Sequence, residues 1–177
     1  ALPSAAELAL DLAGKAEQAL AAGNTELALA LASRAMLPGG SGLAPADVDF
    51  QNARCQSISG AAYALEGRNA LAVMALRRAG DLLVASPWDG QSKPKLRDRV
   101  LTDPGWRRLA WDVFSHLSAS AQATGDLKGA AIAVATASAF AEAPEQRFSL
   151  LSQQAALAFA DGDYRRAEEA FRKSEAE

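Results

Sequence analysis

Residues able to do acid–base, nucleophilic or metal chemistry are few in this chain. Among its 177 residues there is one histidine, His116, and one cysteine, Cys55. Asp112 lies four residues before His116 on an expected helix and can hydrogen-bond it, but the spacing ties no nucleophile to this pair. A single cysteine excludes an intrachain disulfide framework and a cysteine-based zinc site. We therefore expect no catalytic residue, no cofactor and no metal site, with His116 partly buried and Cys55 a small buried side chain.

Glycines and aspartates do not add a catalytic motif. The run Gly39-Gly40-Ser41-Gly42 lacks the lysine of a phosphate-binding loop, and its composition is typical of a flexible linker. Asp47 and Asp49 fall in the first turn of an expected helix, where the helix dipole favours acidic side chains. The sequence therefore favours a non-enzymatic protein.

The composition favours an all-α protein. The chain holds 43 alanines against 11 aromatic residues. Alanine is the best helix former, while the β-favouring Val, Ile and Thr are scarce. No apolar run is long enough to span a bilayer. The net charge of -3 makes nucleic acid an unlikely general partner, since non-specific affinity for it needs a basic surface.

Helix signals divide the chain into eight helices in four hairpins. Ser4 and Glu7 fit a capping box at the start of the first hairpin. The hairpins are expected at about 4–36, 45–85, 103–142 and 144–177, with an irregular insertion at about 86–102 between the second and third. Each hairpin turns at one glycine: Gly23, Gly67, Gly125 or Gly162.

Small residues recur at fixed distances from these turn glycines. Antiparallel helices approach closely only where small side chains face each other, so we expect these positions to be buried at helix contacts. The positions seven before, five after and twelve after each glycine are all Ala, Gly or Ser: Ala16, Gly60, Ser118 and Ala155; Ala28, Ala72, Ala130 and Ala167; Ala35, Ala79, Ala137 and Ser174.

This register resembles the tetratricopeptide repeat, a helix–turn–helix unit. The last hairpin carries the fullest match, with Ala155, Ala158, Gly162-Asp163-Tyr164, Ala167 and Phe171, and the second hairpin follows with Gly60, Tyr63, Gly67, Ala72 and Ala79. The leucine expected just before the first small position is kept only as Leu117, and the linkers are irregular in length. The alternative is a generic alanine-rich helical bundle.

The resemblance implies a single repeat domain over residues 1–177, built as a right-handed α-solenoid of about four hairpins. The first helices of such an array line a concave face, which usually holds a peptide or a partner helix. Glu17, Gln122 and Phe159 are our candidate residues on that face. The Lys and Asn residues that clamp a C-terminal carboxylate in one subfamily are absent. A groove partly filled by the chain's own linkers is the other interpretation.

The centre of the chain is basic and holds the tryptophans. Between Arg77 and Trp111 eight basic residues stand against four acidic ones. Trp and Arg are typical of binding hot spots. A second candidate function is therefore binding of an anionic polymer, a polysaccharide or nucleic acid. The structural alternative is that the tryptophans fill the gap left by the insertion while the charges pair with acidic neighbours. The candidate partner-binding residues are Trp88, Lys93, Lys95, Arg97, Arg99, Trp106, Arg107 and Arg108.

The residues near the two ends of the sequence bear on its cellular setting and its partners. Ala1-Leu2-Pro3-Ser4-Ala5 fits either a mature end left by signal peptidase or an excised domain. Tyr164, Ala167, Ala170, Phe171 and Ser174 are expected to form one helical stripe, which favours further repeats beyond Glu177 or a covering partner. We expect a protein- or peptide-binding scaffold or assembly module. Its preferred setting is a bacterial envelope or secretion complex, with the periplasm slightly favoured over the cytoplasm.

Overall fold

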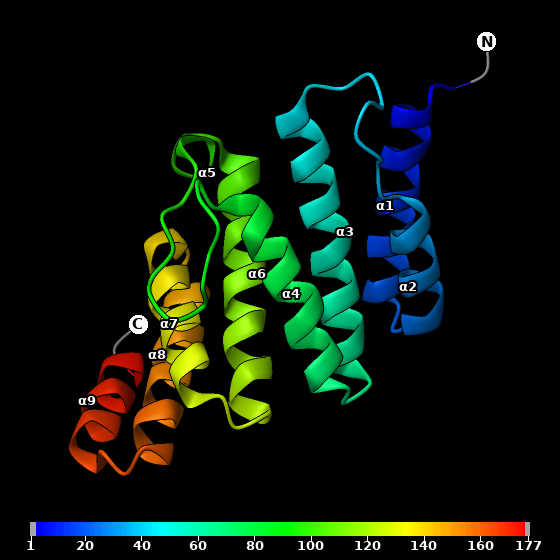
Figure 1. Cartoon of the computed structure of the whole chain (residues 1–177). Helices are drawn as coiled ribbons and strands as arrows, with labels where there is room; N and C mark the ends of the chain where they lie inside the picture. The colour runs from blue at the N-terminus through cyan, green and yellow to red at the C-terminus, as the bar shows by residue number, and fades with distance from the viewer. Residues whose placement is uncertain (1–2, 176–177) are drawn as a thin grey trace. The chain divides into compact units, whose positions relative to one another are not determined.

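A computed structural model describes residues 3–175 of the chain (Figure 1). The expectations about Ala1 and Leu2 and about repeats beyond Glu177 lie outside these residues. Within them the protein is all-helical, with nine α-helices, one short 3₁₀ helix and no strand. The all-α prediction from composition is confirmed.

The chain divides into two compact units, residues 1–84 and residues 85–177. A single domain over 1–177, and its solenoid form, stay predictions. The first unit contains α1 (Ala5–Ala21), α2 (Thr25–Arg34), α3 (Pro45–Leu65) and α4 (Asn69–Leu83). The second contains α5 (Asp98–Thr102), α6 (Pro104–Ala123), α7 (Leu127–Ala137), the 3₁₀ helix η1 (Ser138–Phe140), α8 (Pro144–Ala160) and α9 (Tyr164–Glu175).

The four hairpin turns have the same backbone geometry. Each turn glycine has a positive φ, from 72° at Gly67 to 82° at Gly125, which a residue with a Cβ adopts only with strain. In each turn the glycine N–H and the N–H that follows it donate to carbonyls three and five residues back; at Gly23 the acceptors are Leu20 and Ala19. This is the Schellman ending of a helix, which satisfies its last carbonyls.

The small residues in register with the turns are buried. All twelve positions are buried, and eight of the nine alanines have no exposed surface. A Cβ at Gly60 would lie 2.5 Å from Cγ of Leu76, so α3 and α4 touch at this point. The prediction that these positions mark helix contacts is confirmed.

Side-chain amides hold the first unit together between its hairpins. The Nε2 of Gln51, on α3, donates to the carbonyls of Ala9 and Ala35 at 3.0 and 3.2 Å. The amide of Asn52 pairs with both backbone groups of Leu37, at 2.8 and 2.9 Å. α3 thereby holds the chain that leaves α2, and it packs against both α1 and α2.

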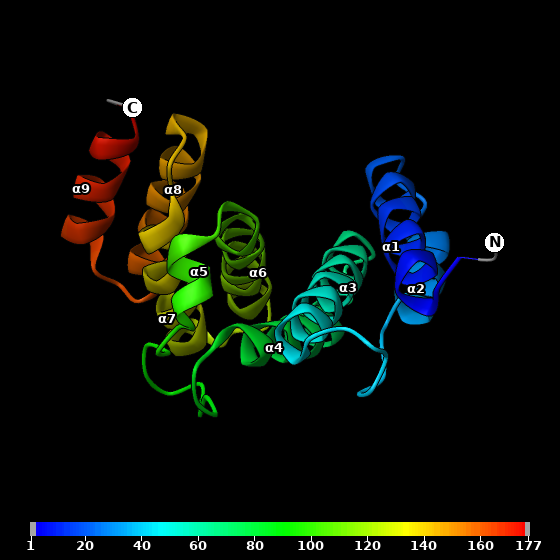
Figure 2. The ribbon, with the colours of Figure 1, turned by 90° about the horizontal axis from the view of Figure 1, so that it is seen from above.

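The insertion differs in part from its prediction as irregular chain. Its last five residues form α5, which lies beside α6 (Figure 2). Helical signals in so short a segment are weak, and α5 is held instead by Val100, which is fully buried. The loop before α5 is tied back on itself where the Ala85 N–H donates to the Lys95 carbonyl at 2.8 Å.

Candidate partner-binding surfaces

His116 and Cys55, the two residues of the chain best suited to catalytic chemistry, differ in exposure. His116 is exposed, so the expectation that it is partly buried is wrong: the buried arc of α6 runs through Val113, Phe114 and Leu117, and His116 lies outside it. Cys55 is 1% exposed, as predicted, and burial raises the pKa of its thiol to about 11. Among residues 3–175, no three His, Cys, Asp or Glu side chains are grouped as a metal ion requires. In the same residues, no helix is long and apolar enough to cross a bilayer.

Two of the three tryptophans of the basic central segment pack inward. Trp88 is half-buried; its indole N–H donates to the Ser92 carbonyl at 2.8 Å, and its ring meets the fully buried Phe114 edge-on, with centroids 5.8 Å apart. Trp106 is only 3% exposed, and the Arg99 guanidinium lies 5.6 Å above its ring. Both ring contacts therefore join the insertion to α6.

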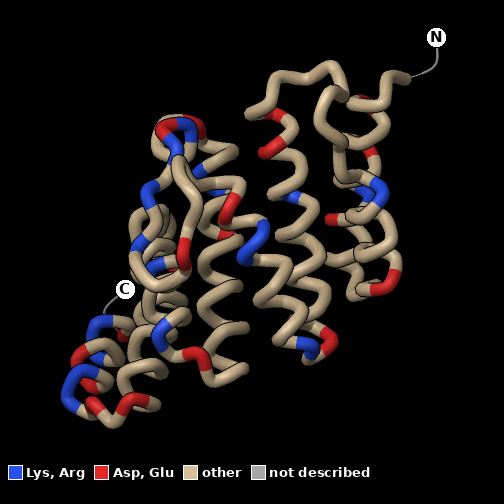
Figure 3. The backbone as a smooth tube through the Cα atoms, viewed as in Figure 1, with Lys and Arg blue, Asp and Glu red and all other residues tan. Residues whose placement is uncertain are grey.

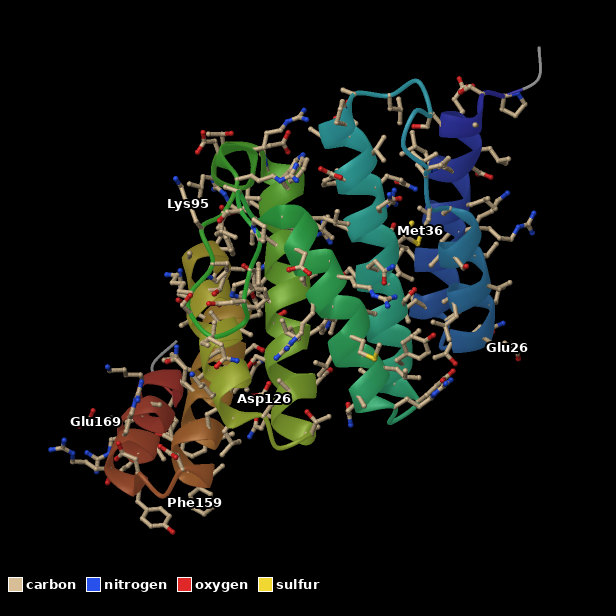
Figure 4. The ribbon with its side chains drawn as sticks, viewed as in Figure 1. Glu26, Met36, Lys95, Asp126, Phe159 and Glu169 are labelled. Atoms are coloured by element: carbon tan, nitrogen blue, oxygen red, sulfur yellow. The ribbon has the colours of Figure 1, made fainter. Side chains whose placement is uncertain are left out.

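The basic residues of this segment divide into two groups. Arg107 is engaged: one guanidinium nitrogen donates to Glu142 and the other to the Leu101 carbonyl at 2.6 Å. Arg97 is half-buried. Lys93, Lys95 and Arg108 are exposed, and Lys95 extends away from the loop in Figure 4.

A groove of about 500 Å³ lies between the starts of α6 and α8. Arg107 and Arg108 line it together with Trp111, which was not among the site residues predicted from the sequence. Asp112 and Glu142 also line it, so acidic and basic side chains are equal in number. This balance does not favour an anionic ligand.

The three candidates on the expected concave face have different surroundings. Both carboxylate oxygens of Glu17 accept hydrogen bonds from Arg54, each at 2.6 Å, so Glu17 joins α1 to α3. Gln122 is half-buried on α6. Phe159 is 61% exposed and points outward at the end of α8 (Figure 4).

Phe159 belongs to an exposed cluster of three aromatic residues on the last hairpin. Its ring meets Tyr164 edge-on at 5.4 Å between centroids, and Phe171 lines the same open hollow of about 450 Å³. Tyr164 is 65% exposed and Phe171 48%. We call Phe159, Tyr164 and Phe171 the aromatic surface.

The stripe expected along α9 is divided between two sides. Its small members Ala167, Ala170 and Ser174 are buried, and α9 packs against α8. Its aromatic members, Tyr164 and Phe171, stay exposed. The small residues of the stripe are therefore already covered by α8, and only Tyr164 and Phe171 remain exposed for the covering partner that the sequence favours.

Corresponding positions in other hairpins identify what is unusual about Phe171. Nine residues after the turn glycine, the first hairpin has Ala32 and the third has Val134, which are 0% and 4% exposed. In both cases the first helix of the following hairpin, α3 or α8, packs on the hairpin that carries the residue. At this position Phe171 is the largest of the three side chains and the most exposed.

Charges of both signs surround the aromatic surface. α9 carries closely spaced acidic and basic residues (Figure 3). Those that line the hollow are Glu168, Arg172 and Glu175, and Arg172 donates to Glu168 at 2.6 Å. One acidic residue thus remains in excess at the rim.

No family model, no curated protein sequence and no solved structure matches the chain. The functional interpretation therefore rests on the surfaces described above.

Proposed function

We propose that the chain is a non-enzymatic scaffold that binds an amphipathic α-helix of a protein partner on its aromatic surface. The observation that carries this proposal is the exposure of Phe171, 48%, at a position that is buried in the first and third hairpins. Exposed aromatic clusters of this kind are unusual on monomeric proteins and are typical of interaction sites.

The internal helix contacts indicate the chemistry of the partner. α3 covers the first hairpin with Cys55 and Ile58, which pack on the alanines of α1 and α2. At the edge of this contact Arg54 pairs with Glu17. A partner helix that covers the last hairpin in the same way needs a stripe of small or branched apolar side chains. A flanking basic residue would complement the excess acid at the rim of the aromatic surface.

A second copy of this chain is a poorer occupant than a foreign helix. Measured from the turn glycines, α1 has Glu7, Asp11 and Gln18 where the covering helix α3 has Gln51, Cys55 and Ala62. The three α1 residues are exposed. Covering the last hairpin with α1 would bury the Glu7 and Asp11 carboxylates against Phe171, which would cost more than the apolar contact returns.

The proposal includes the repeat family of the scaffold and its cellular setting. Four equal turns and twelve buried small positions support a tetratricopeptide-like array as the scaffold. The alanine and arginine content is typical of a GC-rich genome, and a bacterial envelope or secretion assembly is the setting we favour. The anionic-polymer alternative is weakened, since Trp88 and Trp106 are engaged in packing.

A helix library tests the proposal directly. Displayed helices with a fixed polar face and a varied apolar face are selected on the intact chain and counter-selected on the Phe171→Asp variant. We expect enriched helices with apolar residues at i, i+3 or i+4 and i+7, and a loss of about 30-fold in affinity for Phe171→Ala, the effect of removing a hot spot worth about 2 kcal/mol.

The control is Met74→Asp, which changes a side chain that is 52% exposed in the first unit and outside the aromatic surface. Its binding should equal that of the unchanged chain. If no helix survives counter-selection, the proposal is wrong. If sedimentation shows a dimer that Phe171→Asp dissociates, the occupant is a second copy and the proposal is also wrong.

A further inference from the structure

A groove of about 390 Å³ is formed by α7, α8 and α9 in the second unit. Its most buried lining residues are Val134 from α7 and Leu157 and Ala158 from α8. Exposed charged residues stand around it: Lys128, Asp161, Asp163 and Arg166. None of the residues that line this groove belongs to the aromatic surface.

The register of the turns identifies the residues of the first unit that correspond to this lining. Ala158 stands four residues before Gly162, and Tyr63 stands four residues before Gly67. Their backbones are equivalent, since each carbonyl accepts a hydrogen bond at 2.9 Å from the N–H that follows the glycine.

In the first unit the corresponding side chains bind one another. The guanidinium of Arg68, the counterpart of Asp163, lies 5.0 Å above the ring of Tyr63. Arg68 also donates to Glu66, the counterpart of Asp161, at 3.2 Å. At the position of the first unit that corresponds to this groove, an aromatic ring therefore lies beneath a cation.

The second unit lacks that ring. Ala158 stands where the first unit has Tyr63, and Ala131 stands where it has Leu29. Both alanines line the groove. Two side chains that are large in the first unit are thus alanines in the groove, while its lining residues Val134 and Leu157 stand where the first unit has Ala32 and Ala62.

We propose that this groove binds an aromatic side chain of a peptide or protein partner, in the place that Tyr63 fills in the first unit. The volume lies near the small end of the range for ligand sites, about 300–1,000 Å³, which suits one ring and its flanking backbone. Arg166 and Lys128 at the rim can place a cation over the bound ring, as Arg68 does over Tyr63.

The charges around the groove predict how binding responds to salt. Two basic residues, Lys128 and Arg166, face two acidic ones, Asp161 and Asp163, so the rim has no net charge. Lys128 already donates to Gln91 at 2.9 Å. Recognition therefore depends on apolar contact and ring stacking, and it changes little with ionic strength.

The test uses the intact chain and two neutral capped tripeptides, acetyl-Ala-Tyr-Ala-amide and acetyl-Ala-Ala-Ala-amide. Amide chemical shifts are followed by NMR during titration. We expect the tyrosine peptide to shift amides of α7, α8 and α9, with an affinity at least tenfold above that of the alanine peptide. The affinity at high salt should stay within about threefold of that at low salt.

Two variants fill the groove from opposite walls. Ala158→Tyr restores the ring of the first unit and should reduce tyrosine-peptide affinity at least tenfold. Ala131→Leu changes an exposed position and restores the counterpart of Leu29, so it tests the same loss with little risk to folding. The matched control is Ala160→Tyr, at an exposed position outside the groove on α8, the helix of Ala158. It should bind the tyrosine peptide as the unchanged chain does.

The inference is independent of the proposed function. Phe171→Asp, which disrupts the aromatic surface, should leave binding of the tyrosine peptide unchanged. Equal affinity for the two peptides, or undiminished affinity in both Ala158→Tyr and Ala131→Leu, would overturn the assignment of the groove.

Discussion

Replacing glycine by alanine should have opposite effects at two helix positions of the first unit. Gly14 lies in α1 and Gly60 in α3. A Cβ at Gly14 would meet nothing within 4 Å. A Cβ at Gly60 would lie 2.5 and 2.8 Å from Cγ and Cδ2 of Leu76, a side chain with no exposed surface.

The magnitudes follow from these distances. Alanine gains about 0.5–1 kcal/mol over glycine in a helix interior, so Gly14→Ala should stabilise the chain by that amount. At Gly60 the helices must separate by about 1 Å to restore ordinary carbon–carbon contact of about 3.5–4.0 Å. Overpacking of this kind costs about 1–3 kcal/mol, and the propensity gain offsets only part of it. We expect Gly60→Ala to destabilise by about 1–2 kcal/mol.

Urea unfolding and thermal unfolding, both followed by circular dichroism, measure both variants. The melting temperatures should move in opposite directions, by about 2–4 °C for each kcal/mol in a chain of this size. Adding Leu76→Ala should remove most of the penalty at Gly60, which a double-mutant cycle reads as coupling. If Gly60→Ala is as stable as Gly14→Ala, the close approach of α3 and α4 is not real and the reasoning fails.

Three further outcomes are expected. Asn52→Ala should lose about 1–3 kcal/mol of unfolding free energy, because the backbone groups of Leu37 lose their partners in a partly buried place. Burial raises the pKa of the Cys55 thiol from 9.0 to about 11, so between these pH values the folded chain keeps a proton that the unfolded chain releases. The free energy of unfolding should therefore fall by about 2–3 kcal/mol between pH 9 and 11, and this fall should be absent in Cys55→Ala. Trp88→Ala should release the insertion and speed trypsin cleavage after Lys95.

Each of these outcomes has a control. Asn52→Asp keeps the acceptor and loses the donor, so its loss should be intermediate; a loss equal to that of Asn52→Ala contradicts the two-bond interpretation. An identical alkaline decline with and without Cys55 would assign the decline to other groups. Unchanged cleavage in Trp88→Ala would show that the loop is held by contacts other than the Phe114 ring.

The hairpins were predictable because their determinants are local. A glycine that needs a positive φ, and small residues at fixed distances from it, are visible in sequence and control structure over a few turns of helix. The capping box is equally local: the Ser4 hydroxyl accepts from the Glu7 N–H at 3.2 Å, and the Glu7 carboxylate accepts from the Ser4 N–H at 2.7 Å.

The direction of individual side chains was harder to predict, because it depends on distant contacts. Trp88 and Trp106 are as compatible with an exposed binding segment as with a buried anchor until Phe114 and Arg99 are placed beside them. Glu17 resembles a free groove residue until Arg54, 37 positions away, is found against it. The aromatic surface was partly predicted, through Phe159 and the stripe on α9.

The groove of α7, α8 and α9 was missed although its signal is in the sequence. Four residues before the turn glycine, the first, third and fourth hairpins carry Ala19, Ala121 and Ala158, so Tyr63 of the second hairpin is the exception and the alanine in the groove is not conspicuous. Comparing the second and fourth hairpins at this position would have found the difference.

The pairing of helices also has a kinetic consequence. In the residues described, the most extensive contacts join helices that are neighbours in sequence: α1 with α2, α3 with α4, α6 with α7, and α8 with α9. Chains rich in such short-range contacts fold in microseconds to milliseconds, since little loop entropy is lost before contacts form. Each hairpin can therefore nucleate by itself as the chain leaves the ribosome, before the hairpin that will cover it has been synthesised.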